Sequence, residues 1–465
     1  MFRTKIILSA VKETIFVIKG LITKDMAGLY FISRYQYKDL LSLVFLGVFL
    51  LFFGCNGESD VVQTLYLTNS SIIDLTDKAI CIDRDEFKKD YSLNHFPLLI
   101  SGKDTIPSQV NDLNGDEVWD QLFFVINLAA KENKMVQLFW VSTIPEFPVK
   151  TNVRFRKRES RDKLAKPANE EILLANQVPA ALGFQKYQTD GPMWENDKVA
   201  FRHYLDGRNA IDIFGKKNAE ITPSNVGVDS VGVLKDNYHV MHYWGRDIFP
   251  VGNSIGLGGF ALLSGNKIER LGILSKDTLS NIEKTIFKIV ENGPINSVLS
   301  YDYQNWRSSS GKVYRAQEVT SIWPGIYGYK NTVKMEGLKK EDLLLVGLSN
   351  INNRKPLKEI KVGNFICLIQ HDSLTYNRQW ILGTAIIVPK KGYNGYMAAP
   401  KEGQLTDSYL AKLKVENGEP ISYYGVAGWE LSQDPNFKDS TYFTNYVTKL
   451  ASQLSTEVTV EIKEN

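Results

Sequence analysis

The sequence predicts a mainly β protein, in which a small N-terminal β domain precedes a large antiparallel β-sandwich. Short runs rich in β-branched and aromatic residues recur along the chain, and glycine, asparagine and proline separate them. No helical pattern alternates with these runs, which argues against the parallel sheet of an α/β protein. A chain of 465 residues suits two or three domains.

The small domain is expected at residues 56–153. The run 62–67 alternates apolar and polar side chains, as a half-buried strand does. Residues 154–172 are rich in charge, contain a proline and have no apolar periodicity, so we predict a linker or a surface loop there. Further short strands of the small domain are expected at 79–82, 98–100 and 121–128.

The large domain is expected at residues 173–465. Turn residues separate its runs, among them Gly293 and Pro294. One amphipathic helix is predicted at 441–454. Strands are predicted at 285–290, 295–306, 342–346, 365–369, 380–388, 421–429 and 458–462.

Residues 1–55 are interpreted as a targeting segment. Residues 40–53 form an apolar run of the length of a signal-peptide core, which is short for a membrane-spanning helix. Gly54 and Cys55 follow at once, and this arrangement resembles the cleavage box of bacterial lipoproteins. Cys55 would then carry the lipid, and the protein would be anchored in the cell envelope, at the outer membrane surface or in the periplasm. A plain N-terminal membrane anchor is the alternative.

The composition limits the expected partners. The net charge of +3 gives no strong field for a nucleic acid, so no nucleic-acid partner is expected. Aromatic residues make up 11% of the chain, which suits both a β-rich core and surfaces that stack on sugars. Cys81 and Cys367 either pair in an oxidising compartment or remain buried free thiols, and their spacing does not decide between the two.

The stretch 194–215 is the first candidate site. A two-residue period puts Val199, Phe201 and Leu205 on an apolar face, with His203 among them. Clustered polar groups that converge on a cleft mark a binding site, so we expect the opposite face to meet a ligand; a solvated face is the alternative. The polar and charged residues crowded into this stretch are Glu195, Asn196, Asp197, Arg202, Tyr204, Asp206, Arg208 and Asp212.

The second candidate site is the stretch 237–247. It holds His239 and His242, and histidine is the natural proton carrier near neutral pH. Trp244 and Arg246 follow, and an arginine can hold a carboxylate by paired hydrogen bonds. An aromatic core with satisfied histidines is the alternative. A metal is not favoured, because the two histidines lack an obvious third ligand.

The stretch 111–123 is a candidate calcium loop. Four oxygen-bearing residues occupy positions 1, 3, 5 and 9 of a calcium-loop pattern, but Phe123 replaces the glutamate that an EF-hand has at position 12. Side-chain hydrogen bonds to the loop's own backbone, without a metal, are the alternative. The four candidate ligands are Asp112, Asn114, Asp116 and Asp120.

Other motifs are weak or absent. The glycines of the stretch 252–259 do not have the spacing of a nucleotide-binding fingerprint, and no Walker motif, nucleophile elbow or HExxH appears. Trp306, beside Tyr303 and Arg307, is a further candidate for contact with a ligand, although such a residue is more often structural.

Several segments carry a resemblance to a known family. WENDKVAFRHYLDGRNAIDIFGK, HYWGRD, VGNSIGLGG and the ENGP turn with a following tyrosine and tryptophan resemble a family of exported proteins of unknown function, found in polysaccharide-utilisation clusters of glycan-degrading bacteria. The DLNGDEVWDQL turn resembles its N-terminal part, and the resemblance covers roughly residues 60–465. More distantly, the strand pairs are similar to the β-supersandwich of galactose mutarotases and several polysaccharide lyases. The resemblance implies a supersandwich-like fold and a glycan partner, and it names no catalytic residue.

Two classes of function follow. The first is a carbohydrate-active enzyme, either a lyase on a uronate-containing glycan or a glycoside hydrolase. A lyase needs a cation for the uronate, a base for the proton at C5 and an acid for the leaving oxygen, whereas a hydrolase uses two carboxylates. The predicted catalytic residues are His239, His242, Tyr204, Glu195 and Asp197. The predicted substrate-binding residues are Arg202, Asp206, Arg208, Asp212, Trp244, Arg246 and Trp306.

The second class is a non-catalytic glycan-binding lipoprotein. An enzyme requires the stretches 195–212 and 239–247 to face one cleft, whereas a binding module needs only exposed tryptophan and tyrosine on a flat platform. If Arg202 and His242 share a site, Arg202→Ala should impair turnover and leave the melting temperature nearly unchanged.

Overall fold

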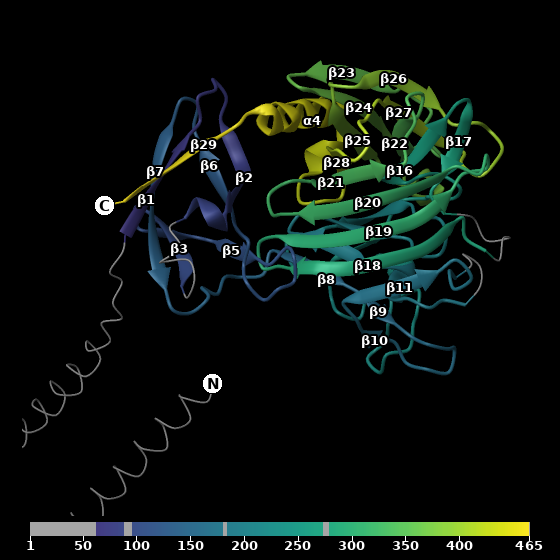
Figure 1. Cartoon of the computed structure of the whole chain (residues 1–465), viewed down its shortest axis with the longest axis horizontal. Coiled ribbons are helices and arrows are strands. Elements are labelled where there is room, and N and C mark those ends of the chain that lie inside the picture. The colour runs from purple at the N-terminus through teal and green to yellow at the C-terminus, as the bar shows by residue number, and fades with distance from the viewer. Residues whose placement is uncertain (1–61, 88–94, 180–183, 273–278, 465) are drawn as a thin grey trace, which may run out of the picture. The chain divides into compact units, whose positions relative to one another are not determined.

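The computed structural model describes residues 62–87, 95–179, 184–272 and 279–464 (Figure 1). These residues form several antiparallel sheets, which confirms the mainly β fold class. The targeting segment, with its candidate lipidated Cys55, lies outside the described residues. Residues from Val61 onward make one compact unit, which contains both the small N-terminal module and the large module.

The small N-terminal module consists of two sheets. The predicted strand at 121–128 coincides with β6, and apolar side chains such as Leu65, Phe124 and Trp140 fill the module's core. The five-stranded sheet has the order β29-β1-β7-β3-β4 and the other sheet β2-β6-β5. Their strands are β1 (Val62–Thr68), β2 (Leu75–Asp83), β3 (Phe96–Ser101), β4 (Asp104–Ile106), β5 (Ser108–Asn111), β6 (Gln121–Leu128), β7 (Asn133–Val141) and β29 (Thr459–Glu464).

The C-terminal end of the chain returns to this small module. Strand β29 pairs antiparallel with β1, so the last strand lies in the small module and not in the large sandwich. Helix α4 (Ser440–Ser455) precedes it and confirms the helix predicted at 441–454. The ammonium group of Lys78 donates to the carbonyl oxygens of Gln453 (2.9 Å) and Thr456 (2.7 Å), which lie at the end of the helix, where backbone acceptors lack helical partners.

The large module is built on a nine-stranded antiparallel sheet with the order β11-β18-β19-β20-β21-β28-β25-β24-β23. Side chains on one face of this sheet, such as Tyr301 and Tyr329, belong to the main hydrophobic core. Its strands are β11 (Glu170–Leu174), β18 (Ile282–Asn292), β19 (Ser297–Arg307), β20 (Val313–Ile322), β21 (Gly328–Glu336), β23 (Lys358–Val362), β24 (Phe365–Asp372), β25 (Leu382–Pro389) and β28 (Pro420–Trp429).

Two five-stranded sheets cover that core face. They meet where Ile211 bridges Gly256, and a β-carbon on Gly256 would lie 2.0 Å from the Ile211 carbonyl oxygen, so only glycine permits this approach. One sheet contains β17 (Lys267–Arg270), β16 (Leu257–Ser264), β22 (Leu343–Ser349), β27 (Ser408–Leu413) and β26 (Tyr393–Ala398). The other, which carries the candidate site, contains β15 (Gly245–Asp247), β14 (Ile211–Lys216), β13 (Val199–His203), β12 (Met193–Asn196) and β8 (Thr151–Arg154).

The charged segment 154–172 differs from the expected linker or surface loop. It includes β9 (Arg156–Lys157) and β10 (Lys166–Pro167), which pair with each other. Its end belongs to β11, which pairs with β18 at the edge of the nine-stranded sheet. The apolar periodicity is missing because these strands are short or lie at an edge, where few side chains are buried.

A buried glutamate lies in the middle of the large core. Glu318 accepts hydrogen bonds from the Tyr303 hydroxyl (2.9 Å) and from the Asn331 amide (2.7 Å), and burial raises its pKa to about 7. Because this pKa lies above the ordinary 4.5, the folded protein holds the proton more tightly than the unfolded chain does. Glu318 therefore costs stability progressively as the pH rises from about 4.5 to about 7.

The variant Glu318→Gln should flatten this part of the pH dependence. We expect the free energy of unfolding of the wild type to fall by roughly 2–3 kcal/mol more than that of the variant between mildly acidic and mildly alkaline pH. Urea unfolding of the wild type and the variant, at a mildly acidic and at a mildly alkaline pH, measures this difference. Equal pH dependence in the two proteins would show that Glu318 has no raised pKa.

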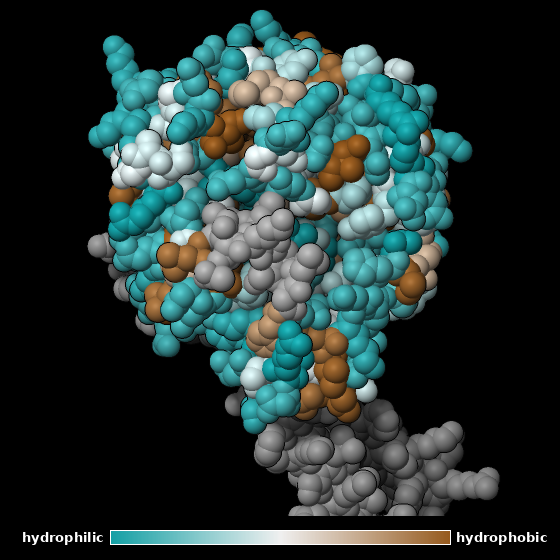
Figure 2. Space-filling view, turned by 90° about the vertical axis from the view of Figure 1, so that its right-hand side faces the viewer, coloured by the Kyte–Doolittle hydropathy of each residue, from teal (hydrophilic) through white to brown (hydrophobic). Residues whose placement is uncertain are grey.

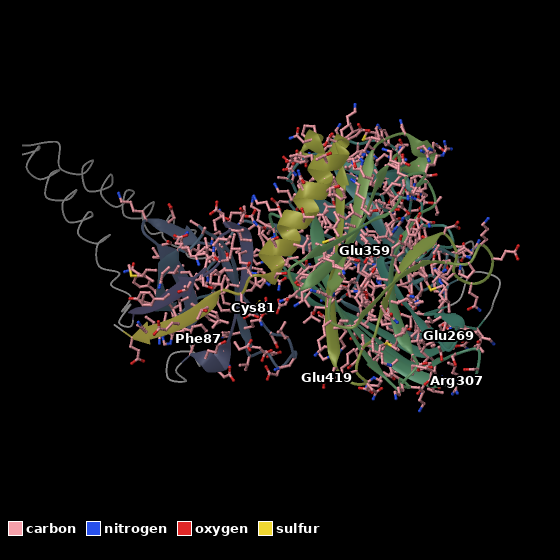
Figure 3. All side chains as sticks on the ribbon, turned by 90° about the horizontal axis from the view of Figure 1, so that it is seen from above. Cys81, Phe87, Glu269, Arg307, Glu359 and Glu419 are labelled. Carbon is pink, nitrogen blue, oxygen red and sulfur yellow. The ribbon has the colours of Figure 1, made fainter. Side chains whose placement is uncertain are left out.

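The described surface and its cysteines give no sign of a spanning segment or a disulfide. Among the described residues, no helix has the length and apolar character that crossing a membrane requires. The face in Figure 2 is mostly hydrophilic, with its apolar residues scattered. Cys81, labelled in Figure 3, is exposed, whereas Cys367 is buried, and both are free thiols. The paired alternative is therefore wrong in this structure.

Candidate functional site

The two-residue period of the first candidate stretch holds in the structure. Val199, Phe201 and Leu205 belong to the main core, where Phe201 packs edge to face on Tyr329 of the nine-stranded sheet at 4.7 Å between ring centroids. The opposite face carries Arg202, which pairs with Asp212 in the register of β13 and β14. This opposite face is also buried, because the segment between β14 and β15 covers it with aromatic side chains.

Arg202 is the centre of a buried charged cluster. Its side chain is 1% exposed, and it contacts Asp212, the Tyr204 hydroxyl and Asp247, the last at 3.0 Å from Nη2 to Oδ2. Both carboxylates are fully buried, and the Tyr204 hydroxyl donates to Asp212 at 2.8 Å. Two buried carboxylates around one guanidinium need that cation, because an unpaired buried charge is costly.

The cluster joins the two candidate stretches. Asp247 lies on β15, which approaches β14 closely at Gly245: a β-carbon there would lie 1.7 Å from the Gly215 carbonyl oxygen. Nδ1 of His239, from the short 3-10 helix η3 (Asn237–His239), lies 3.5 Å from Oδ2 of Asp247, and the histidine side chain is 46% exposed. The buried network of Arg202 therefore reaches the surface at His239.

Arg208 covers another side of the cluster. Its Nε donates to both oxygens of Asp206 at 2.9 Å, and its guanidinium lies 3.6 Å from the centre of the Tyr204 ring. Arg208 thus closes the cluster on one side and is already paired. Asp190, 29% exposed, lies 3.7 Å from Arg202 on another side.

A third element, from much later in the chain, completes the cluster. Tyr376 lies in the 3-10 helix η4 (Tyr376–Arg378), and its ring stands edge-on to His239 at 6.4 Å. The Arg246 guanidinium lies 5.5 Å from the Trp380 ring centre, and its Nε donates to the Asp247 carbonyl oxygen (2.9 Å). Arg246 forms no salt bridge with a carboxylate in the described part of the chain.

Strained backbone flanks the cluster on two sides. Thr189 and Asp190 have φ of 51° and 59°, and Asn377 and Arg378 have φ of 55° and 56°. Side chains rarely adopt this left-handed conformation, least of all a β-branched one, and such residues gather at functional sites.

The electrostatic environment sets the protonation of the exposed groups. Burial, aided by Arg202, lowers the pKa of His239, so this histidine is neutral at pH 7. Burial and the neighbouring Asp247 raise the pKa of Tyr376, so its phenol stays protonated. Burial and Asp212 raise the pKa of Asp247, while Arg202 opposes this shift. The cluster thus brings together an exposed neutral histidine, a partly exposed protonated tyrosine and a partly exposed arginine.

Two predicted catalytic carboxylates lie elsewhere. Glu195 is buried with the ammonium group of Lys216 at 2.6 Å, and it accepts from the Thr222 hydroxyl at the same distance. Asp197 accepts from the backbone N–H of Gly325 at 2.9 Å and takes no part in the Arg202 cluster. Both carboxylates are thus bound by protein groups outside the Arg202 cluster, and a catalytic role for either stays a prediction.

Other predicted residues are also structural. Trp306 is fully buried in the main core and Trp244 packs against Phe214, so neither presents a ring to a ligand in this structure. His242 stacks on Trp244, and its Nε2 lies 2.7 Å from the Asn237 carbonyl oxygen. The alternative of a satisfied histidine in an aromatic setting therefore fits His242, and the site interpretation fits His239.

The candidate calcium loop is held by its own backbone. Oδ1 of Asp112 accepts from the N–H of Gly115 (2.7 Å), and Oδ2 of Asp120 accepts from the N–H of Leu113 (2.7 Å). Asn114 and Asp116 accept backbone hydrogen bonds in the same way. No group of three or more His, Cys, Asp or Glu in the described ranges could hold a metal ion, and calcium binding stays a prediction.

Sequence reasoning missed three members of the cluster, Asp190, Asp247 and Tyr376. Asp247 is the last residue of the stretch 237–247, which also contains Arg246. Its position in a short strand beside β14 could have been expected from the sequence pattern. Nothing in the sequence signals that Asp190 and Tyr376 lie beside them.

Comparisons with known proteins give weak matches to solved structures. A protein in glycosyl hydrolase family 38 from Enterococcus faecalis is 12% identical, with a TM-score of 0.45, and the match covers 88% of this chain and 48% of that one. An α-mannosidase from Enterococcus faecalis V583 is 11% identical, with a TM-score of 0.45 and coverage of 87% and 46%. The chain thus spans about half the length of these two proteins.

Sequence comparisons identify the family. A protein from Formosa agariphila, described as "Uncharacterized protein P7", is 25% identical over 301 residues, which are 60% of this chain and 69% of the relative. A family model described as a domain of unknown function, DUF4861, matches residues 67–460. This match agrees with the expected membership of a family of unknown function, and the polysaccharide-utilisation context stays a prediction. Because the model spans most of the chain, the protein belongs to the DUF4861 family.

Proposed function

We propose that the protein is a carbohydrate-active enzyme that cleaves a uronate-containing glycan by β-elimination. The observation that carries this proposal is the meeting of the two candidate stretches at Arg202 and Asp247, with His239 at the surface. Convergence of charged groups with shifted pKa values marks functional sites. The groups at the edge of the cluster are an exposed neutral histidine, a partly exposed protonated tyrosine and a partly exposed arginine without a carboxylate partner among the described residues.

Each of these groups has a role in an elimination. Arg246 binds the uronate carboxylate, which makes the proton at C5 more acidic. His239 accepts this proton, while Asp247 holds the histidine ring and Arg202 holds Asp247. The electron pair of the C–H bond forms the C4–C5 double bond as the C4–O bond breaks. Tyr376 donates its proton to the leaving oxygen.

The carboxylates favour elimination over hydrolysis. A glycoside hydrolase needs two accessible carboxyl groups, one on each side of the bond that breaks. Asp206 is paired with Arg208, and Asp212 is buried with Arg202. Glu195 is paired with Lys216. These three acids cannot leave their partners without creating an unpaired buried charge, so Asp190, 29% exposed, is the one carboxylate described in the cluster that has clear access to solvent.

The tryptophans argue against a purely binding module. Such a module needs exposed tryptophan and tyrosine on a flat platform, and the exposed tyrosines Tyr243, Tyr396 and Tyr442 lie in separate segments. Seven of the eight tryptophans are buried, and Trp380 alone is partly exposed, next to Arg246. We propose that Trp380 packs against the sugar ring while Arg246 holds its carboxylate. Attachment to the cell envelope through a lipid on Cys55 is a further proposal, made on the sequence pattern.

A screen of acidic polysaccharides tests the proposed reaction. The purified chain is incubated with each glycan, with and without EDTA. We expect ultraviolet absorbance from unsaturated uronates to rise together with the number of reducing ends, and EDTA to abolish both only if the Asp112 loop or another metal site is needed. Reducing ends without absorbance would replace the lyase with a hydrolase. Silence in both assays would contradict the proposed lyase.

A further inference from the structure

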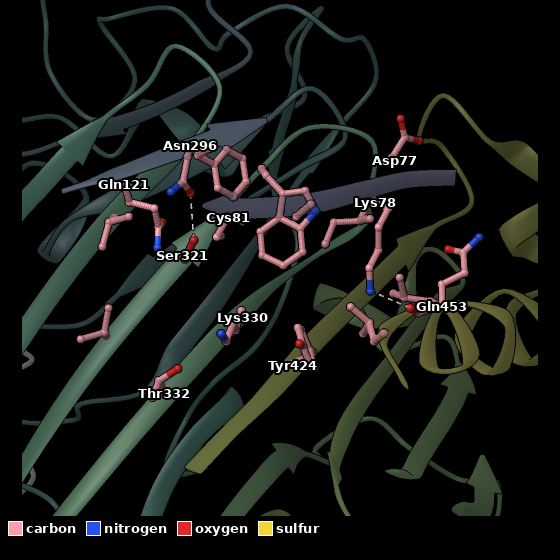
Figure 4. A pocket seen from close by; sticks show the side chains of 18 of the residues that line it. Asp77, Lys78, Cys81, Gln121, Asn296, Ser321, Lys330, Thr332, Tyr424 and Gln453 are labelled. Carbon is pink, nitrogen blue, oxygen red and sulfur yellow. Dashed lines mark hydrogen bonds between the residues drawn. The ribbon is translucent and has the colours of Figure 1, made fainter. Parts of the chain in front are cut away.

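A cavity of about 330 Å³ lies away from the Arg202 cluster, between the small module and the large one (Figure 4). Its walls come from β2 and β6, from helix α4, and from β19, β20, β21 and β28. The sheet residues that line it point away from the main core. No lining residue belongs to the Arg202 cluster.

The cavity has the size and lining of a small-molecule site. Ligand pockets typically enclose about 300–1,000 Å³ and are lined by aromatic and apolar side chains with a few polar groups. Phe123 and Trp323 pack against each other at 6.5 Å between ring centroids, and they form an aromatic wall with Ile326 and Leu450. The volume lies at the small end of the range, which suits one sugar ring or two.

Three polar residues at one end of the cavity have a hydrogen-bond donor without a protein acceptor among the described residues. Lys330 makes no salt bridge or hydrogen bond with any described residue, although it is only partly exposed. Asn296 is buried; its Oδ1 accepts from the Ser321 hydroxyl at 2.8 Å, and its Nδ2 has no partner in the described chain. The Tyr424 hydroxyl likewise has none there, and the pKa of this tyrosine is raised to about 12 by burial, so it keeps its proton.

The carboxylate and the second cation lie at the other end. Asp77 is the one carboxylate among the described lining residues, and Figure 4 places it beside Lys78 and Gln453, away from Lys330. The Lys78 ammonium is held by the carbonyl groups at the end of α4. Lys330 lies beside Tyr424 of β28 and Ser321 of β20 in the sheet register, and Ser321 in turn donates to Asn296. This end of the cavity therefore carries a cation and neighbouring donors, which suit an anion.

We propose that this cavity is a second ligand site, which binds a single carboxylate-bearing sugar, that is, a uronic acid. Lys330 neutralises the carboxylate, the Asn296 amide and the Tyr424 hydroxyl donate to it, and the apolar face of the ring packs against the wall of Phe123 and Trp323. The anion and the apolar wall are inferred from the contacts of the cavity, and the choice of a sugar rests on the carbohydrate activity proposed above.

Calorimetric titration of the purified chain with D-glucuronate tests the site, with D-glucose as the neutral comparison. We expect glucuronate to bind at least tenfold more tightly than glucose, and Lys330→Met to weaken this binding at least tenfold because the charge-assisted bond is lost. Lys334→Met is the matched control: Lys334 lies on the same face of β21, outside this cavity, and its loss should leave the affinity unchanged.

A second readout locates the ligand without relying on a variant. Cys81 lines the cavity, and Lys330 is one of the charges that act on its thiol. Glucuronate should slow the alkylation of Cys81, followed on its peptide by mass spectrometry, and His239→Ala should leave this protection intact. Absence of glucuronate binding at millimolar concentration, equal affinity in Lys330→Met, or unprotected Cys81 would overturn the proposal, whatever the outcome for the proposed reaction.

Discussion

Replacing Arg202 with alanine is expected to destabilise the fold by about 3–5 kcal/mol. The substitution leaves Asp212 and Asp247 buried together without a cation. It also removes the hydrogen bond that Arg202 donates to the Tyr204 hydroxyl. This expectation reverses the one drawn from the sequence, in which Arg202 meets a ligand and its loss spares the melting temperature. The burial of the side chain is the reason for the change.

Thermal and urea unfolding measure this effect in Arg202→Ala, in a control variant and in a variant that combines Arg202→Ala with two aspartate changes. Arg307→Ala is the control: Arg307 is a mostly exposed arginine with one surface salt bridge, so its loss should cost less than about 1 kcal/mol. Asp212→Asn and Asp247→Asn, added to Arg202→Ala, should recover part of the loss because they remove the unpaired charges. An unchanged melting temperature in Arg202→Ala would show that the cluster is open to solvent.

Replacing His239 with alanine should lower kcat by about 10²–10⁴-fold on the glycan found in the screen, because a positioned general base contributes that much. The melting temperature should change little, since the side chain is nearly half exposed and ends a short 3-10 helix. Steady-state kinetics on both proteins, followed by the absorbance of the unsaturated product, measure the loss.

His242→Ala is the matched control for this prediction. It removes the same side chain three residues along the same segment, where the ring stacks on Trp244 and contacts a backbone carbonyl group. We expect this variant to keep wild-type kcat within a few-fold, with any loss appearing in stability. Equal kinetic losses in both variants would mean that the segment, and not the His239 side chain, is needed.

Local patterns predicted the parts of the fold that depend on neighbours in sequence. The helix at 441–454 and the strand at 121–128 were predicted within one residue of α4 and β6 at each end, because apolar periodicity defines them. The pairing of β29 with β1 joins opposite ends of the described chain, and such a long-range contact cannot be predicted from local sequence patterns. The small module was therefore assigned without its last strand.

The candidate site was predicted in the same partial way. A two-residue period correctly put Arg202 and Asp212 away from the apolar face, but it could not reveal that the following segment covers them. His239 and His242 are equivalent in sequence, and tertiary contacts alone separate them: one faces Asp247 and the other stacks on Trp244. Tyr376 belongs to a 3-10 helix more than a hundred residues later in the chain, so no sequence pattern indicated its contact with His239.

The most direct test of the central claim is a proton NMR titration of the five histidines, with the His239 signal assigned from His239→Gln. Burial and Arg202 lower the pKa of His239, so its signal should titrate below the ordinary value of 6.5. An acidic oligosaccharide should shift the His239 signal and leave the signal of His203, buried in the core, in place. An unshifted His239 signal under saturating oligosaccharide, or a pKa at or above 6.5, would contradict a site at the surface of the Arg202 cluster.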